Sequence, residues 1–214
     1  MVRYFPIVGL ILGCLLSAVD LLATRLWSVH IASLLDVLFL AAITGALHLD
    51  GVGDTADGLF SHRGKNRALE IMKDSRIGVM ALVSVVFLLA LKWGGVSGLQ
   101  HHRGLILILV PAYARAAVLF GIRFLPYGRK AGTGRSFFDD PLDNRDFLPF
   151  AVPVVLSVWL GWTGLALNMA FALIVLLILQ FYRRQMGCIT GDMLGAMIEV
   201  TEMFLFIVIS IRYI

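Results

Sequence analysis

The sequence predicts an all-α integral membrane protein, a polytopic helical bundle of about seven transmembrane helices with six as the alternative. Of the 214 residues, 59% are hydrophobic and only 15% are charged, whereas soluble domains are nearer half apolar and a quarter charged. The apolar residues also gather in runs of about 20, the length that crosses a bilayer core. A chain of this length favours one integral membrane domain over residues 1–214 rather than two domains.

Seven apolar runs mark the expected spans. They lie near residues 4–24, 31–49, 77–98, 104–125, 147–160, 164–182 and 192–212. The first run is expected to remain as a helix rather than to be removed as a signal peptide. The fifth run is short, and the segment Gly-Trp-Thr-Gly at residues 161–164 joins it to the sixth. These two runs form either one long broken helix or a tight hairpin, which keeps six spans as the alternative.

The distribution of Lys and Arg predicts the orientation. With seven spans, one side receives Arg3, Arg63, Lys65, Arg67, Lys73, Arg76, Arg123, Arg129, Lys130, Arg135, Arg145, Arg183 and Arg184. The other side receives Arg25, Lys92, Arg103 and Arg212. Cytoplasmic loops carry an excess of basic residues, so the N-terminus and the polar segments 50–76, 126–146 and 183–192 are expected in the cytoplasm. The same excess explains the net charge of +4 without nucleic-acid binding.

Three aspartates end the second apolar run. Asp50, Asp54 and Asp57 are spaced i, i+4 and i+7, so a helix that continues through them would place the carboxylates on one stripe. Like charges on one stripe repel one another unless a cation lies between them. A hard divalent cation such as Mg²⁺, which prefers oxygen ligands, would reconcile them. A solvated helix end with spare acids is the alternative interpretation.

A second pair of acids, Glu70 and Asp74, follows a basic segment. If a helix begins near Asn66, these two acids are spaced i, i+4 and face the same way. An antiparallel neighbouring helix would then present Asp74 to the three aspartates, and the combined carboxylates would suit one or two Mg²⁺ ions. We therefore expect Asp74 to belong to the site and leave the role of Glu70 open.

Cations near the acids are candidates for phosphate binding. They are Arg63, Arg129, Lys130 and Arg135. Arg63 belongs to a basic segment between the two acidic motifs, where anionic lipid and a substrate phosphate are equally reasonable partners. The other three belong to residues 129–135, Arg-Lys-Ala-Gly-Thr-Gly-Arg. A loop of this composition offers a phosphate both side-chain charge and backbone N–H groups.

Polar residues also occur within later apolar runs. Arg115 should face the bundle interior and have a partner, either a protein carboxylate or a substrate phosphate. Thr190 is expected to cap the last helix, with Asp192 in its first turn; alternatively, this helix start faces the site and helps to hold metal or phosphate. Glu199 and Glu202 lie one and two turns further on, where acids are functional by default because burying them unpaired is costly.

The two acidic motifs together resemble the signature of a known family. The segment His-Leu-Asp-Gly-Val-Gly-Asp-Thr-Ala-Asp-Gly at residues 48–58, followed by Glu-Ile-Met-Lys-Asp-Ser-Arg-Ile-Gly at 70–78, is similar to cobalamin synthase, the adenosylcobinamide-GDP ribazoletransferase family. Residues 4–9 and 190–202 resemble the early and late segments of the same family. The resemblance covers nearly the whole chain.

The resemblance implies a Mg²⁺-dependent reaction at the membrane. A ribose hydroxyl of α-ribazole, or of its 5′-phosphate, attacks the cobinamide-side phosphorus of adenosylcobinamide-GDP; GMP leaves and a phosphodiester remains, in the last steps of cobalamin biosynthesis. Mg²⁺ held by Asp50, Asp54, Asp57 and Asp74 would neutralise phosphate charge. The alcohol also needs a carboxylate base, for which we expect Asp74, with Asp57 second.

The expected partners follow from this reaction. They are the two substrates and the lipid bilayer, with the active site on the cytoplasmic face of the cell (inner) membrane; no nucleic acid is expected, and a homo-oligomer stays open. Two places depart from the family pattern. The Phe5-Pro6 motif lies near the beginning of the chain, where members carry a further segment, and Cys188 stands where the late motif has a second glycine.

Two other functions remain as alternatives. Asp54-x-x-Asp57-Gly58, then Arg63 and Asp74, is loosely similar to the motif of CDP-alcohol phosphotransferases, but the spacing is shorter and the Ala-Arg pair is absent. An ion-coupled transporter is less well supported. Transporter sites lie near the midplane in repeated halves, whereas these acids gather at one membrane face and the sequence shows no repeat.

Overall fold

The computed structural model describes residues 1–132 and 134–211, and this part of the chain is built from helices. The α-helices are α1 (Phe5–Leu26), α2 (Val29–Ile43), α3 (Leu47–Leu59), α4 (Lys65–Ile71), α5 (Val79–Ser97), α6 (Arg103–Phe124), α7 (Ala151–Ser157), α8 (Trp162–Gln185) and α9 (Gly191–Ile209). Short 3-10 helices are η1 (Val2–Tyr4), η2 (Arg135–Phe138), η3 (Asn144–Phe150) and η4 (Val158–Leu160). The all-α class predicted from the sequence is confirmed.

Several of these helices can cross a membrane. Within the described residues, α1 with its preceding 3-10 turn, α5, α6 and α8 are long and apolar enough, and α2 with α3 makes a fifth if the bent pair is one span. By contrast, α7 has only 7 residues, and α9 carries Asp192, Glu199 and Glu202. The polytopic helical bundle is therefore supported, but the predicted count of seven spans is not confirmed.

The second predicted run, 31–49, is broken rather than straight. α2 ends at Ile43, and α3 begins at Leu47 after a bend of 86°. Gly45 and Ala46 make the bend with φ angles of 58° and 57°. This left-handed region is open to glycine but costs energy for alanine. The three aspartates therefore lie on a helix of their own and not on the end of a straight span, as the sequence had led us to expect.

The fifth and sixth predicted runs form a tight hairpin. The chain reverses at Gly161, which has a φ of 59°. A Cβ atom on Gly164 would lie 1.9 Å from the Ser157 carbonyl oxygen, so the two arms touch at backbone distance. Across the turn, the Asn168 amide donates to the Ser157 hydroxyl at 2.8 Å. Of the two arrangements that the sequence left open, the hairpin is the correct one.

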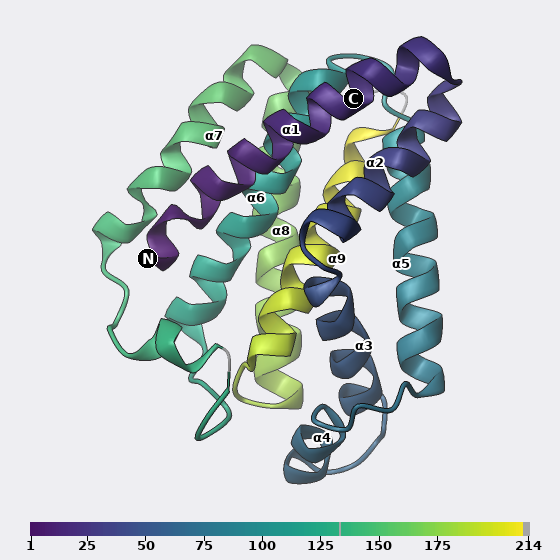
Figure 1. Cartoon of the computed structure of the whole chain (residues 1–214). Helices are drawn as coiled ribbons and strands as arrows, with labels where there is room; N and C mark the ends of the chain where they lie inside the picture. The colour runs from purple at the N-terminus through teal and green to yellow at the C-terminus, as the bar shows by residue number, and fades with distance from the viewer. Residues whose placement is uncertain (133, 212–214) are drawn as a thin grey trace.

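The core of the bundle is centred on α6. Every residue from Leu109 to Leu119 is buried, and α1 crosses close to this helix (Figure 1). Cβ atoms on Gly9 and Gly13 would lie 2.5 Å from the Ala112 Cα and 2.2 Å from the Ile108 carbonyl oxygen. Small residues spaced by four let membrane helices approach in this way. The close contact makes α1 and α6 a rigid base for the rest of the bundle.

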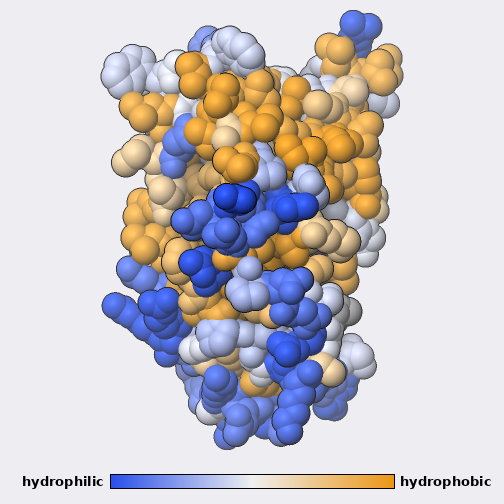
Figure 2. Space-filling view, turned by 90° about the vertical axis from the view of Figure 1, so that its left-hand side faces the viewer, coloured by the Kyte–Doolittle hydropathy of each residue, from blue (hydrophilic) through white to orange (hydrophobic). Residues whose placement is uncertain are grey.

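The polar segments gather at one end of the bundle. In Figure 1, α4, the link from α6 to α7 and the link from α8 to α9 all lie toward the lower end, while the C-terminal end of α9 lies toward the top. The side view in Figure 2 shows hydrophilic surface at this lower end and mainly hydrophobic surface above it. The arrangement agrees with the expectation that residues 50–76, 126–146 and 183–192 share one face. We call this face the polar end.

Two of the cations that the sequence assigned to the opposite face are held in ion pairs, Lys92 buried and Arg103 partly buried. Lys92 lies inside α5 and is only 1% exposed. Arg103 begins α6 and binds Asp20 and Asp36 at 2.7 and 3.0 Å. Arg25 remains at the end of α1, and Arg212, the fourth of these cations, lies outside the described residues.

Candidate active site

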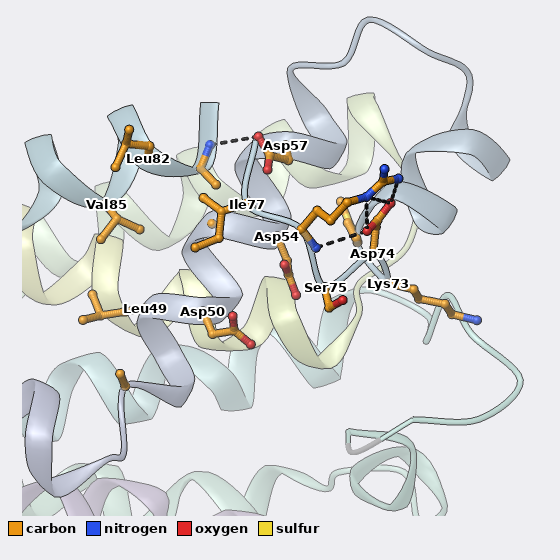
Figure 3. A pocket seen from close by; sticks show the side chains of 15 residues that line it. Leu49, Asp50, Asp54, Asp57, Lys73, Asp74, Ser75, Ile77, Leu82 and Val85 are labelled. Atoms are coloured by element: carbon orange, nitrogen blue, oxygen red, sulfur yellow. Dashed lines mark hydrogen bonds and ion pairs between the residues drawn. The ribbon is translucent and has the colours of Figure 1, made fainter. Parts of the chain in front are cut away.

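An acid-lined cavity of about 600 Å³ opens at the polar end. It lies between α3, the beginning of α5 and the link over residues 72–77. Its acidic residues are Asp50, Asp54, Asp57 and Asp74. Figure 3 shows the first three leaving one side of α3, with Asp74 across from them on the link. The stripe that the i, i+4, i+7 spacing predicted is therefore present, because successive residues of a helix turn by about 100°.

Small residues set the position of α3. A Cβ atom on Gly51 would lie 2.6 Å from the Asp192 carbonyl oxygen, so this face of α3 meets the beginning of α9 at backbone distance. On the adjoining face, a Cβ on Gly53 would lie 3.2 Å from the Ala81 side chain of α5. The helix is therefore held between α9 and α5, with its acid stripe turned toward the cavity.

Asp57 caps the helix that forms the opposite wall. Its carboxylate accepts hydrogen bonds from the backbone N–H groups of Gly78 at 2.6 Å and of Ala81 at 2.9 Å. These are unpaired donors at the N-terminus of α5, where a negative charge is also favoured by the helix dipole. A Cβ atom on Gly78 would lie 2.4 Å from one Asp57 oxygen, so only glycine fits beside this cap. Asp57 thus joins α3 to α5.

Asp74 is held by its neighbour Arg76. The guanidinium donates from Nε to Asp74 Oδ1 at 2.9 Å and to Oδ2 at 3.1 Å, and the Arg76 backbone N–H adds a third bond at 3.1 Å. These hydrogen bonds lower the pKa of Asp74 from its ordinary value of 3.8 to about 2. Asp74 therefore stays ionised at neutral pH and is a weak base as long as Arg76 remains in place.

The helix expected to carry Asp74 ends before reaching it. α4 stops at Ile71, so Glu70 and Asp74 do not share a helical face as predicted. Glu70 instead pairs with Arg67 at 2.7 Å on the surface, where both side chains are about two-thirds exposed. An irregular link, and not an antiparallel helix, presents Asp74 to the aspartates. Glu70 is not among the residues that line the cavity.

Arg129 contacts both the beginning of α9 and a residue that lines the acid-lined cavity. Its Nη1 lies 2.7 Å from Asp192 Oδ2, and its Nη2 donates to the carbonyl of Met72 at 3.4 Å. Met72 lines the acid-lined cavity. The charges of Arg129 and Asp192 both act on Asp54, which stands among like charges from Asp50, Asp57 and Asp192. Arg129 is therefore the predicted phosphate-binding cation that the fold brings to the acids.

A short backbone ladder holds Arg129 in this place. The Gly128 N–H donates to the Ile189 carbonyl, and the Ile189 N–H donates to the Pro126 carbonyl, each at 2.9 Å. Tyr127 and Ile189 form the corresponding parallel bridge. Residues far apart in the sequence are thus tied into one rim beside α9. The sequence does not predict this contact, because a strand is recognised by alternating apolar and polar residues and a single bridge does not require such a pattern.

The remaining predicted site residues lie elsewhere. Thr190 is fully buried and accepts a hydrogen bond from the Met193 N–H at 3.2 Å, which confirms its expected role as a helix cap. Arg63, Lys130 and Arg135 are exposed and do not line the acid-lined cavity. Arg63 lies in the link between α3 and α4, and the other two lie in the link after α6. The structure thus brings Arg129 to the acids, but not these three cations.

Arg115 belongs to a buried charge network, which consists of Lys92, Arg115, Glu199 and Glu202. Lys92 binds Glu199 and also Glu202, the latter at 2.7 Å, and Arg115 binds the other oxygen of Glu202. All four residues are at most 4% exposed, and their charges balance. A protein carboxylate is therefore the partner of Arg115 through Nη1, while its Nε and Nη2 are buried without a hydrogen-bond partner among the described residues. Lys92 was not predicted to belong to this network, because it lies near the end of an apolar run, where a lysine is typical of a loop.

The acids suit a hard cation, although they do not converge on one point. Among the described residues, no three His, Cys, Asp or Glu side chains stand close enough together to hold a metal ion. Asp57 accepts hydrogen bonds from backbone N–H groups, and Asp74 accepts them from Arg76. Asp50 and Asp54 accept no hydrogen bond within the described part of the chain. Mg²⁺ commonly binds one or two carboxylates and completes its shell with water and substrate phosphates. The free pair fits that pattern.

Comparison with known proteins places this site in a family. A family model described as cobalamin-5-phosphate synthase matches residues 1–210. A protein of Alkaliphilus metalliredigens named adenosylcobinamide-GDP ribazoletransferase is 38% identical over 93% of this chain and 80% of its own length. Proteins of that name from Roseiflexus sp. and Herpetosiphon aurantiacus are each 36% identical, over 94% and 96% of this chain and 75% and 83% of their own lengths. No solved structure matches. The chain belongs to the cobalamin-5-phosphate synthase family.

Proposed function

We propose that this chain is a transferase that joins adenosylcobinamide-GDP to α-ribazole, or to α-ribazole 5′-phosphate. The ribose hydroxyl oxygen forms a bond to the cobinamide-side phosphorus, the bond from that phosphorus to the bridging oxygen of the pyrophosphate breaks, and GMP leaves with that oxygen. The names of the relatives support this substrate pair. The observation that carries the proposal is that four acids line one opening at the polar end, with Arg129 beside this opening, bound to Asp192 and to the Met72 carbonyl.

Charge neutralisation is the main task of such a site, because phosphoryl transfer depends on positioning and on electrostatic stabilisation. We assign Mg²⁺ to Asp50 and Asp54, where it would supply positive charge to the transferring and leaving phosphates. Asp57 and Asp74 are the other two carboxylates of the proposed set. Arg129 lies beside them, with its Nε buried and without a hydrogen-bond partner among the described residues. This guanidinium is the protein group that we assign to a substrate phosphate.

Asp74 is our candidate for the base that accepts the hydroxyl proton, with Asp57 second. Asp74 is exposed to the cavity from a short link, whereas both Asp57 oxygens already accept backbone hydrogen bonds. Arg76 must turn away before Asp74 can act, because the pKa of about 2 leaves little affinity for a proton. We therefore propose that substrate phosphate draws the Arg76 guanidinium from Asp74 when the donor binds.

We place the enzyme in the cell (inner) membrane with the polar end in the cytoplasm. Basic residues concentrate at that end, and such an excess is typical of cytoplasmic loops. Adenosylcobinamide-GDP carries phosphate charges and the acceptor carries a polar ribose, so an opening at the aqueous face is required. The apolar helices that are long enough to cross a membrane support the lipid bilayer as a partner.

The proposal is tested by the identity of the released nucleotide. The purified protein, in detergent or in liposomes, is given adenosylcobinamide-GDP and α-ribazole with Mg²⁺, and parallel samples receive EDTA or receive CDP-diacylglycerol as donor. We expect GMP release that stops with EDTA and returns when Mg²⁺ is restored. Release of CMP from the lipid donor would contradict the proposal, as would GMP release that EDTA does not affect.

A further inference from the structure

A second cavity, of about 200 Å³, lies beside the acid-lined one and shares Asp50 with it. We call it the side cavity. It is enclosed by α3, α9, α6, the N-terminal end of α1 and the link after α6, and its lining residues include Phe5, Val118, Phe137, Leu194 and Ile198. Asp50 therefore stands on the wall between two spaces, and a molecule in either space can reach its carboxylate.

The side cavity has an apolar floor and a few polar groups. Val118, Leu194 and Ile198 form the floor and are at most 4% exposed. The Phe5 and Phe137 rings meet edge to face, with centroids 5.5 Å apart, on another side. A concave apolar surface with a few convergent polar groups is the usual design of a small-ligand site. This floor suits a flat, uncharged ring rather than a phosphate.

Its polar side chains are those of His48, Asp50 and Asp192. Nδ1 of His48 is buried and lies 3.9 Å from Oε1 of Glu199, a member of the buried charge network. Asp192 is held by Arg129 at 2.7 Å. Asp50 is shared with the acid-lined cavity and Asp192 binds Arg129 beside it, whereas Val118, Leu194 and Ile198 line the side cavity alone. A ligand with one apolar and one hydroxyl-bearing end would have a defined direction in this space.

Backbone contacts keep the side cavity narrow. A Cβ atom on Gly195 would lie 3.3 Å from the His48 Cα, and one on Gly134 would lie 3.1 Å from the Gly191 Cα. All three glycines line the cavity. Its volume of about 200 Å³ is below the roughly 300–1,000 Å³ of sites for drug-sized ligands. The space therefore admits one ring system, whereas the acid-lined cavity has three times that volume.

We infer that the side cavity is the acceptor subsite. The base of the acceptor nucleoside lies on Val118, Leu194 and Ile198, and its ribose points past Asp50 into the acid-lined cavity, where the larger donor binds. The inference rests on the proposed function, because only that function supplies a small nucleoside and a bulky partner. Asp50 then stands where the two substrates meet, and Ile198 limits the size of the base.

The test places a larger side chain in one cavity at a time. Ile198→Phe narrows the side cavity, and Val85→Phe, the matched control, narrows the acid-lined cavity. KM values for α-ribazole and adenosylcobinamide-GDP are measured from GMP release. We expect Ile198→Phe to raise the KM for α-ribazole by about tenfold or more and to leave the KM for the donor unchanged. Val85→Phe should show the reverse pattern.

Two further measurements separate failure of the inference from failure of the proposed function. Equilibrium binding of α-ribazole, followed without a donor, should weaken by a similar factor in Ile198→Phe; equal binding in both proteins would overturn the inference even if no GMP is ever released. Ile198→Ala enlarges the side cavity and is the variant to use if Ile198→Phe fails to fold. It should accept acceptor nucleosides with larger bases, and an unchanged base preference would also overturn the inference.

Discussion

The four acids of the cavity are held in different ways, and this difference determines what each can do. Asp57 accepts two backbone hydrogen bonds, and Asp74 is bound by Arg76. Asp50 and Asp54 have no hydrogen bond or ion pair within the described residues, although Asp54 lies close to the charges of Asp192 and Arg129. The spacing in the sequence correctly predicted the shared face. It did not predict these partners, because Asp57 meets backbone groups more than 20 residues away.

Arg76→Ala should raise the pKa of Asp74. The Arg76 hydrogen bonds are the main cause of the value near 2, so their loss should return the carboxyl toward its ordinary 3.8. In the wild type, the ionised form is lost only as the pH falls through about 2; in the variant, it should be lost at higher pH. Carboxyl NMR titration of Asp74 measures this directly. An unchanged titration would show that Arg76 does not hold Asp74 in the folded protein.

Asp57→Ala should destabilise the fold through the loss of a helix cap. Removal of a cap costs about 0.5–2 kcal/mol of unfolding free energy, and Asp57→Asn should cost less because its amide oxygen still accepts one N–H. Asp50→Ala is the matched control, since Asp50 lies on the same stripe and caps no helix. Thermal unfolding in detergent gives the comparison. Equal midpoints for Asp57→Ala and Asp50→Ala would contradict the capping role.

Among the helices, the bend between α2 and α3 has the largest effect on the site. The apolar run over residues 31–49 contains no proline, so its hydropathy pattern indicated one straight helix. The bend arises at Gly45 and Ala46, and alanine in the left-handed region is rare enough that sequence rules do not anticipate it. The bend lets α3 pack against both α5 and α9. The site therefore depends on a feature that hydropathy alone does not reveal.

The buried charge network links three helices, α5, α6 and α9. Lys92→Met would leave Glu199 and Glu202 with Arg115 as their one remaining cation in the network. Breaking a buried ion pair costs about 3–5 kcal/mol, so the midpoint of thermal unfolding should fall well below that of Lys65→Met, which removes an exposed lysine. The double variant with Glu199→Gln should recover part of the loss. If Lys92→Met unfolds like Lys65→Met, the network does not hold these helices together.

For the molecule as a whole, composition was the most informative feature of the sequence. The hydrophobic content and the apolar runs predicted the helical membrane class, and the basic residues predicted which polar segments share a face. The number of spans was harder to predict. Hydropathy does not distinguish an apolar run that crosses a membrane from one such as α7, which is short and packs against other helices.

The proposed orientation predicts the accessibility of the two ends. After Cys14→Ala and Cys188→Ala remove the native thiols, single cysteines are placed at Asp140 on the polar end and at Gln100 between α5 and α6, both exposed positions. A membrane-impermeant maleimide applied to spheroplasts should label Gln100→Cys at once and Asp140→Cys only after lysis. The reverse pattern would place the polar end, and with it the proposed site, outside the cell.

The acid stripe of α3 is the part of the molecule to which we assign phosphoryl transfer. Asp54→Asn removes one charge from the middle of that stripe with almost no change in shape, and Glu70→Gln makes the same change at an exposed acid outside the cavity. Mg²⁺-dependent GMP release from adenosylcobinamide-GDP is measured for both variants in matched liposomes. We expect Asp54→Asn to lose nearly all GMP release while its unfolding midpoint stays equal to that of the wild type. Glu70→Gln should release GMP at the wild-type rate. Wild-type turnover by Asp54→Asn would contradict the assignment.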